Sequence, residues 1–425
     1  MDRGRRHHSC WGNHRRWCCC RGWRCGPRRS PRVLNCRWRS GAANWRKGKL
    51  INDVKVAIVT ESASVWGAEH SLLILLEQFK QQGIEATTVL AQGSPFKRIL
   101  DTRNHRAIEY RFAKHPALAG GSFSTASRND IAKEPFNVLA SGVRLAKVLK
   151  DFDLALSFSL WQSPETIIAS RIRRIPCVLD LHETFSGGQS VRLTKFIGNF
   201  CSGVIAPSLS IVRSSGLTLS PKVRVIGRPV EVDKTTNQHR NARLPLTVGI
   251  FGQIVPHKGV HQLVSAVEAM PQGALNLMVV GGTKEADRRT PFELDLRERV
   301  SRMPRSQFLD RVGAVGPYMR KCDLVVNLSE HEAFGRTVVE AISCGAYPVV
   351  LDGSGPAEIV NATGVGKVIE SVEDLEGFLI SLCGPGGMVK LDELFRDRAH
   401  WPDAVDQFAA RSVGERYAAA LKSFA

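Results

Sequence analysis

The chain has 425 residues, of which 43% are hydrophobic and 23% are charged, and its net charge is +19. This composition excludes a disordered protein, and the length suffices for two domains of α/β size. A charge of +19 would suit a nucleic-acid-binding fold, but most of it is local. Residues 1–50 hold 15 Lys or Arg and the single acid Asp2, so +14 lies there and +5 on the other 375 residues. We therefore predict no specific nucleic-acid partner.

The first 50 residues differ from the rest of the chain in other ways, because they hold six of the eleven Cys and five of the eight Trp. The Cys spacing does not supply two C-x-x-C pairs, which disfavours a zinc module. The segment is neither Ser-rich nor amphipathic, which disfavours a transit peptide. We predict an unstructured basic segment, typical of wrong-frame or upstream DNA that has been translated before a start near Leu50 or Val54. The sequence alone leaves that start open.

The remaining five Cys are scattered, which is typical of buried thiols in a reducing cytosol. No run of 18 or more apolar residues occurs, so we expect no membrane-spanning helix. The basic start also lacks the apolar core of a secretory signal. These features predict a cytoplasmic protein.

From about residue 51, short β-branched runs alternate with helical patterns. Residues 54–60 predict a buried parallel strand followed by a small-residue loop. Residues 68–83 predict a helix, because Leu72, Leu73, Leu76 and Phe79 share one face and Gly83 stands at the C-terminal cap. Further strands are expected at 84–91, 152–159, 175–183, 202–208 and 223–227. The alternation predicts that residues 51–228 form a parallel sheet with helices on both faces.

Polar residues 229–245 interrupt this pattern and predict a linker. Strand, glycine-containing loop and helix then begin again at residue 246, with later strands expected at 276–282, 323–329 and 346–352. We therefore predict an α/β chain of two doubly wound Rossmann-like domains that face each other across a cleft. The second domain would span 246–410, and a helix over 411–425 would pack back on the first. Ligands of such sheets bind beyond the carboxyl ends of the strands, which places the site in the cleft.

Two glutamates flank a Phe-Gly step in the stretch SEHEAFGRTVVEAISCGAYPVV, residues 329–350. On one helix, Glu332 and Glu340 would lie roughly 12 Å apart, beyond the roughly 5 to 9.5 Å of glycosidase carboxylate pairs. This disfavours a hydrolytic pair and favours two carboxylates that bind different hydroxyl groups. Gly335 would let the backbone approach a ligand, and a helix starting near Arg336 would direct N–H groups at phosphate. Lys258, in a Gly-containing loop before a helix, would stabilise phosphate charge.

Gly353, Ser354 and Gly355 precede another helix start, where a second set of free N–H groups and a plain turn are equally open interpretations. No Asp-x-Asp motif stands at a strand end, and residues 51–425 contain no His or Cys cluster. We therefore predict no metal and no other cofactor.

Six blocks of the chain, spread from residue 54 to its end, resemble the family-4 retaining glycosyltransferases of the GT-B fold (glycosyl transferases group 1). They are GAEHSLLILLEQFKQQG, IPCVLDLHE, SGVIAPS, FGQIVPHKGV, DLVVNLSEHEAFGRTVVEAISCGAYPVV and GSGPAEIV. The most specific part is the pair of acids separated by seven residues around Phe-Gly. The resemblance implies transfer of a sugar from a nucleotide-diphosphate donor with retention of anomeric configuration. The acceptor would be a glycan, a lipid-linked glycan or a small molecule, and contact with the inner face of a membrane would suit a lipid-linked one.

The resemblance also implies roles for individual residues. The catalytic candidates are His182, Lys258 and Glu332, with Glu332 facing the donor sugar. The donor-binding candidates are Gly67, Gly252, Gln253, Lys258, Glu332, Ala333, Phe334, Gly335, Arg336, Thr337 and Glu340, with Glu340 on the ribose hydroxyls. The family often has Arg at the position of Gln253, and whether Arg336 or His257 replaces that cation stays open. Trp66 beside Gly67 would line the acceptor path or serve packing.

Three other classes of protein remain as alternatives. A nucleotide-sugar epimerase can share this architecture, and it would convert a sugar nucleotide without any acceptor. A non-catalytic nucleotide-sugar binder is the second alternative, because Gln253 departs from the family pattern. A nucleic-acid binder is suggested by residues 1–50 alone.

Overall fold

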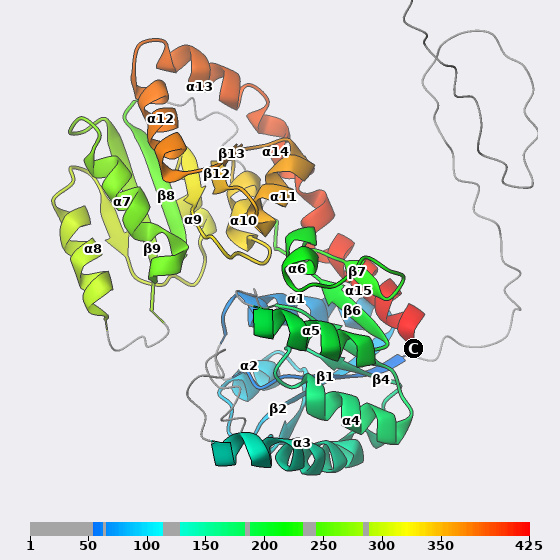
Figure 1. Ribbon diagram of the computed structural model, residues 1–425. Helices are drawn as coiled ribbons and strands as arrows, with labels where there is room; N and C mark the ends of the chain where they lie inside the picture. Colours follow the sequence, from blue (N-terminus) through cyan, green and yellow to red (C-terminus); the bar gives the residue numbers. More distant parts are fainter. Residues whose placement is uncertain (1–53, 63–64, 114–127, 183–187, 233–243, 284–288) are drawn as a thin grey trace, which may run out of the picture. The chain divides into compact units, whose positions relative to one another are not determined.

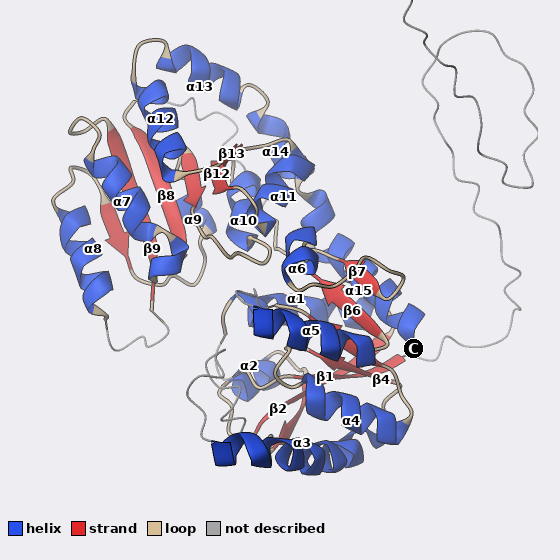
Figure 2. Cartoon of the chain, in the orientation of Figure 1, coloured by secondary structure: helices blue, strands red, loops and turns tan. Residues whose placement is uncertain are grey.

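We describe a computed structural model of the protein over residues 54–62, 65–113, 128–182, 188–232, 244–283 and 289–425. The predicted unstructured segment 1–50 and most of the predicted linker lie outside the described residues. Residues 51–425 form one compact unit that contains two parallel sheets (Figures 1 and 2).

The first sheet has seven parallel strands in the order β3-β2-β1-β4-β5-β6-β7. They are β1 (Val54–Val59), β2 (Ile84–Ala91), β3 (Arg106–Tyr110), β4 (Leu154–Ser157), β5 (Cys177–Asp180), β6 (Gly203–Ala206) and β7 (Val223–Val225). Strand β1 shows why this sheet forms, because Val56, Ala57, Ile58 and Val59 are all fully buried. A strand covered on both faces requires such a continuous apolar run.

The helices of this half divide between the two faces of the sheet. They are α1 (Gly67–Gln81), α2 (Phe96–Thr102), α3 (Arg128–Val148), α4 (Ser163–Arg173), α5 (Gly188–Phe200) and α6 (Leu209–Ser214). Val56 and Ile58 pack with α1 and α2, whereas Ala57 and Val59 on the opposite face pack with α3 and α4. Helices α3, α4 and α5 lie side by side in that order (Figure 1).

The second sheet has six parallel strands in the order β10-β9-β8-β11-β12-β13. They are β8 (Leu246–Gln253), β9 (Leu275–Gly282), β10 (Gln307–Leu309), β11 (Leu324–Asn327), β12 (Tyr347–Leu351) and β13 (Lys367–Ile369). Its helices are α7 (Val260–Glu268), α8 (Pro291–Ser301), α9 (Gly316–Met319), α10 (Arg336–Ser343), α11 (Gly355–Thr363), α12 (Val372–Cys383), α13 (Gly387–Phe395) and α14 (Trp401–Ala404). In both sheets the strand order reverses beside the first strand, which is where doubly wound folds bind ligands.

The last helix, α15 (Ala410–Phe424), packs on the first half. Its side chains Val413, Tyr417 and Leu421 are fully buried in the core that also contains α1. The two helices approach closely, since a Cβ at Gly414 would lie 2.4 Å from Cβ of Gln78. Among the helices in the described part of the chain, none is long and apolar enough to cross a bilayer.

Candidate functional site

A cleft of about 1110 Å³ is lined by residues from both halves of the compact unit. The first half contributes the start of α1, and the second contributes the carboxyl ends of β8 and β11 together with the start of α10. Strands β8 and β11 are the neighbours at which the strand order reverses. The cleft therefore lies where the topology of the second sheet places a ligand site.

All twelve residues that the sequence nominated line this one cleft. They are Gly67, His182, Gly252, Gln253, Lys258, Glu332, Ala333, Phe334, Gly335, Arg336, Thr337 and Glu340. Their convergence is a geometric fact, and their chemical roles stay predictions.

Lys258 and Glu332 form an ion pair in the cleft. Lys258 ends a short 3-10 turn after β8, and its Nζ lies 2.5 Å from Oε2 of Glu332. Gly259, which follows, has φ of 70°, and a Cβ there would lie 2.5 Å from Cβ of Leu328. Glycine thus permits the tight turn that brings Lys258 to the cleft. Both charged side chains are 25% exposed, so an anionic ligand can reach the ammonium group.

Helix α10 presents the second pair of charges. Gly335 precedes the helix with φ of 96°, and a Cβ at this position would lie 2.8 Å from Cγ of Pro356. The helix buries its apolar positions Val338, Val339, Ala341 and Ile342. Because of this periodicity, Arg336, Thr337 and Glu340 are left on the side that lines the cleft.

Arg336 links the two halves across the cleft. Its guanidinium donates hydrogen bonds to the carbonyl of Gly67 at 3.1 Å and to Oγ of Ser71 at 3.3 Å. It also lies 3.3 Å from Oε1 of Glu340. His257 was the other residue considered as a replacement for the Arg expected at position 253. It is exposed and does not line the cleft. Of the two candidates, Arg336 is therefore the one placed to meet a ligand in the cleft.

Two glycines at the ends of β8 and β9 bring these strands into close contact beneath the cleft. Gly252 has φ of 142° and Gly281 has φ of 157°. A Cβ on Gly281 would lie 1.7 Å from the carbonyl oxygen of Gly252, which leaves no room for any other residue. Gly252 was predicted from the sequence and Gly281 was not, although the double glycine at the end of a predicted strand could have identified it.

His182 follows β5 and lies against Phe158, with ring centroids 4.0 Å apart. Burial, and then the nearby guanidinium of Arg228, hold the pKa of His182 well below its ordinary value. The imidazole is therefore neutral at pH 7 and can both donate and accept a hydrogen bond.

A buried cluster lies beside His182, whose Nε2 is 3.7 Å from Oδ1 of Asp180, and it was not foreseen from the sequence. Arg228 lies 2.7 Å from Oδ1 of Asp180, and their side chains are 5% and 0% exposed. Arg228 also donates to the hydroxyl of Tyr417 and to the carbonyl of Leu181. The cluster lies next to the cleft and connects Asp180 of β5 with Arg228, which follows β7, and with Tyr417 of α15.

Residues 311–317 line the cleft and were also missed by the sequence analysis. The guanidinium of Arg311 lies 4.5 Å from the ring centroid of Trp66 and donates to the carbonyl of Val65 at 2.6 Å. Trp66 therefore packs against Arg311 on the wall of the cleft.

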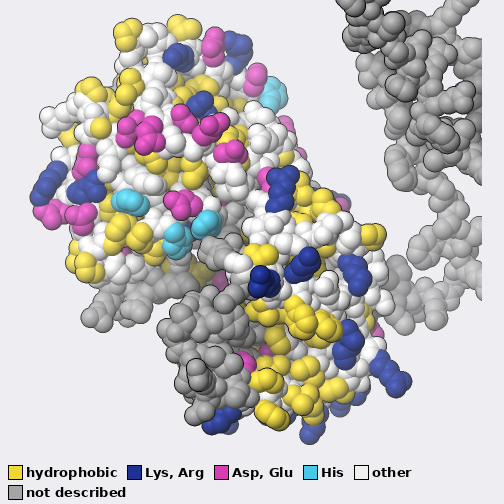
Figure 3. Space-filling model, in the orientation of Figure 1, with side chains coloured by type: hydrophobic (Ala, Val, Ile, Leu, Met, Phe, Trp, Pro, Cys, Tyr) yellow, Lys and Arg dark blue, Asp and Glu magenta, His cyan; other side chains and the backbone are white. Residues whose placement is uncertain are grey.

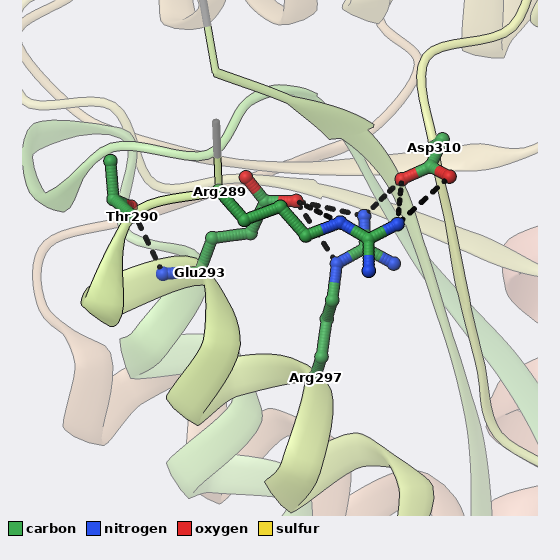
Figure 4. Close-up of polar contacts among 5 residues, drawn as sticks. All are labelled: Arg289, Thr290, Glu293, Arg297 and Asp310. Atoms are coloured by element: carbon green, nitrogen blue, oxygen red, sulfur yellow. Dashed lines mark hydrogen bonds and ion pairs between the residues drawn. The ribbon is translucent and has the colours of Figure 1, made fainter. Parts of the chain in front are cut away.

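Helix α8 anchors the start of that loop (Figure 4). Asp310 is bound by Arg297 and by Arg289, the latter at 3.3 Å. The nearly buried Glu293 holds Arg297 at 2.8 Å, and Thr290 caps the helix by accepting a hydrogen bond from the N–H of Glu293. This network fixes the residue immediately before Arg311.

The segment Gly353, Ser354 and Gly355 does not line the cleft. The N–H of Gly355 donates to the carbonyl of Glu332 at 3.0 Å, so it stabilises the turn that precedes α10. Three residues further on, the carboxylate of Glu358 accepts from the N–H groups of Leu209 and Ser210 at 2.8 and 2.5 Å. The geometry thus favours the turn over a second phosphate site.

Residues 232–381 match the family model "Glycosyl transferases group 1". Together with the two-sheet architecture, this match defines the chain as a glycosyltransferase of the GT-B fold with a group 1 domain over those residues.

Three known proteins show the extent of the similarity. The chain is 25% identical over 360 residues to a GDP-mannose-dependent alpha-mannosyltransferase of Mycolicibacterium smegmatis, covering 77% of this chain and 87% of that protein. It is 26% identical over 363 residues to the lipopolysaccharide core biosynthesis glycosyltransferase LpsE of Rhizobium meliloti, covering 84% and 96%. The structure of Anabaena HepE in complex with UDP superposes with a TM-score of 0.69 at 20% identity, covering 87% and 100%. The predicted fold class and the predicted transferase activity are confirmed.

Proposed function

We propose that the protein is a family-4 enzyme that transfers a sugar from a nucleotide-diphosphate donor to a glycan or lipid-linked glycan with retention of anomeric configuration. The observation that carries this proposal is the convergence of Lys258, Arg336, Glu332 and Glu340 with the start of α10 in one cleft. Two cations and a helix N-terminus suit a diphosphate, and two carboxylates suit hydroxyl groups.

The diphosphate would lie between Lys258 and the start of α10. Glu332 is ion-paired with Lys258, and a bound phosphate would take over the ammonium group and release the carboxylate. Arg336 would supply the second cation in place of the Arg that the family often has at position 253. As the bond to the sugar breaks, negative charge grows on the diphosphate, and these fixed donors stabilise it.

The two carboxylates would fix the rest of the donor. Glu332, once released from Lys258, would accept hydrogen bonds from the transferred sugar. Glu340, held by Arg336 on α10, would accept from the ribose hydroxyls. The neutral imidazole of His182 would bind a further sugar hydroxyl, since a neutral ring can accept as well as donate.

The proposed reaction breaks the bond between the anomeric carbon and the diphosphate oxygen. The acceptor oxygen forms its bond to the anomeric carbon on the same face, and its proton passes to the leaving phosphate. Both glutamates are ion-paired with cationic side chains, which supports a binding role over a nucleophilic one. Metal independence is part of the proposal, with Lys258 and Arg336 as the organic cations.

The names of the relatives direct the choice of donor and acceptor. GDP-mannose is our first candidate donor because one relative is named for it, and lipopolysaccharide core biosynthesis in another suggests a lipid-bearing glycan acceptor. These names also support a role in polysaccharide or glycoconjugate biosynthesis. We propose a cytoplasmic location for the reaction.

The test is a donor screen of the full chain against GDP-mannose and a panel of UDP-sugars. Release of nucleoside diphosphate is measured by chromatography, with Lys258→Ala as the inactive control. We expect one donor to be turned over, with water taking the place of the acceptor, and NMR of the sugar at the moment of release to show the donor's anomeric configuration. An epimerised sugar nucleotide would instead identify an epimerase, and nucleotide binding without turnover of any donor would identify a binder.

A further inference from the structure

Large apolar side chains are exposed on the outer face of the layer formed by α3, α4 and α5, which we call the outer helical layer. The exposed residues on these helices are Phe136, Leu139, Val143, Ile172, Phe196 and Phe200. They are six of the 13 exposed large hydrophobics in the described part of the chain. Exposure of single apolar residues is ordinary, but such a concentration on one layer marks an interaction surface.

The spacing of these residues shows that they form stripes. Phe136, Leu139 and Val143 follow one another at i, i+3 and i+7 along α3, so they share one side of the helix. Phe136 is 74% exposed, whereas Leu145 on the other side of α3 is fully buried. On α5, Phe196 and Phe200 are one turn apart with ring centroids 4.8 Å from each other. Each helix therefore has a second apolar side that no described residue covers.

The exposed charged side chains on the described parts of these three helices are all basic, although Figure 3 also shows acidic side chains nearby and the exposed Asp151 lies just beyond the end of α3. The exposed charged residues of described segments 133–148, 163–174 and 190–200 are Lys133, Arg144, Lys147, Arg171, Arg173, Arg174, Arg192 and Lys195. Among the residues of these segments whose exposure is described, no acid is exposed. The surface therefore alternates apolar side chains with cations.

A hollow of about 500 Å³ lies at the end of this layer, where α4 and α5 finish. Its lining includes Arg171, Arg174, Lys222 and Phe200, and none of the described residues that line it is acidic. The guanidinium of Arg171 lies 5.8 Å from the ring centroid of Phe200 and donates to that residue's carbonyl at 3.4 Å. The hollow thus places cations directly beside an exposed aromatic ring.

We propose that the outer helical layer docks the enzyme on an anionic lipid bilayer. Phe136, Phe196 and Phe200 would enter the boundary between headgroups and acyl chains, and Arg171, Arg174 and Lys222 would bind a headgroup phosphate in the hollow. A bilayer presents a layer of negative charge above an apolar interior, which complements this arrangement of apolar residues and cations. Nucleic acid would match the cations but would leave the aliphatic residues Leu139, Val143 and Ile172 without apolar contact.

The test is co-sedimentation of the full chain with vesicles at physiological ionic strength. One set of vesicles contains phosphatidylcholine alone, and the other contains phosphatidylcholine mixed with phosphatidylglycerol. We expect binding to the mixed vesicles and little binding to the neutral ones. The basic segment 1–50 is present in every variant, so differences between variants report on the layer.

Two double variants separate the apolar and charged contributions. Phe196→Ser with Phe200→Ser, and Arg171→Glu with Arg174→Glu, should each lower vesicle affinity about tenfold or more. The matched control is Ile380→Ser with Val389→Ser, because these side chains are also exposed, at 58% and 64%, but lie on α12 and α13. The control should bind vesicles as the parent does. Donor turnover without vesicles should be unchanged in all three, which keeps this proposal separate from the proposed function.

Three results would overturn the proposal. Equal binding of the parent and both double variants to anionic vesicles would assign the affinity to another part of the chain. Equal binding to neutral and anionic vesicles would remove the role of the cations. Loss of binding in the Arg variant alone, with competition by inorganic phosphate, would indicate a site for a soluble anion.

Discussion

Two of the ion pairs at the cleft, Lys258–Glu332 and Arg228–Asp180, differ in exposure. The side chains of Lys258 and Glu332 are both 25% exposed, whereas those of Asp180 and Arg228 are 0% and 5% exposed. A partly exposed pair can exchange one partner for a ligand at small cost. A buried pair cannot, because separating it leaves an unsolvated charge. This difference supports the proposed role of the first pair in donor binding, and it indicates that the second pair stabilises the contact of β5 with α15.

The largest expected effect is on the buried pair. Arg228→Met should lower the free energy of unfolding by about 3 to 5 kcal/mol, because it leaves the carboxylate of Asp180 buried without its cation. The measurement is urea denaturation followed by circular dichroism. The matched control is Arg411→Met, which removes an exposed pair with Glu415 and should cost less than about 1 kcal/mol. A loss below 1 kcal/mol in Arg228→Met would contradict the structural role of this cluster.

The next effect separates the two pairs by function. Lys258→Ala should lower kcat about a hundredfold or more, since removing a donor that stabilises transition-state charge costs about 2.7 kcal/mol. Its unfolding free energy should change by about 1 kcal/mol at most, as is typical of a partly exposed pair. His257→Ala, one residue earlier on the exposed side of the same turn, is the control and should keep near-parental kcat. Near-normal turnover in Lys258→Ala would remove this residue from the mechanism.

The same contrast explains what the sequence could predict. The residues around Lys258 and Glu332 lie in compact blocks whose glycines, strand ends and helix periodicity can be recognised locally. Tyr417, by contrast, contacts Asp180 although the two residues are 237 positions apart in the sequence. No local sequence pattern predicts such a contact. Residues 311–317 were missed for the same reason, because only the tertiary fold brings Arg311 against Trp66.

The strands show a parallel difference. The central strand β1 was predicted from its continuous apolar run, which is typical of a strand that is buried on both faces. The three strands that the sequence analysis missed are β3, β10 and β13, and each lies at the edge of its sheet. In β3 and β10 most residues are exposed or only half-buried, as an edge position allows, so their sequences lack a continuous apolar run. Pairing with a neighbouring strand, which sequence periodicity does not encode, stabilises them.

A third prediction compares two of the i,i+4 pairs of Arg and Glu, Arg336–Glu340 at the cleft and Arg411–Glu415 on α15. Glu340→Gln should weaken nucleoside diphosphate binding about tenfold, or about 1.4 kcal/mol, because an amide accepts weaker hydrogen bonds than a carboxylate. Isothermal titration calorimetry measures this affinity. The matched control is Glu415→Gln, which changes the same kind of pair on α15 and should leave affinity unchanged. Unchanged affinity in Glu340→Gln would return this residue to a structural role.

The smallest expected effect is that of metal removal, and it tests whether the exposed charges suffice for the diphosphate. If Lys258 and Arg336 supply the positive charge, treatment with EDTA should change kcat by less than about twofold, because the fixed cations already stabilise the leaving group. The measurement is donor turnover in EDTA, compared with turnover after Mg²⁺ or Mn²⁺ is added back. A tenfold loss in EDTA that either ion restores would mean that the organic cations are insufficient. The role of Arg336 as the second cation would then fail, since the charge missing at Gln253 would come from a metal ion.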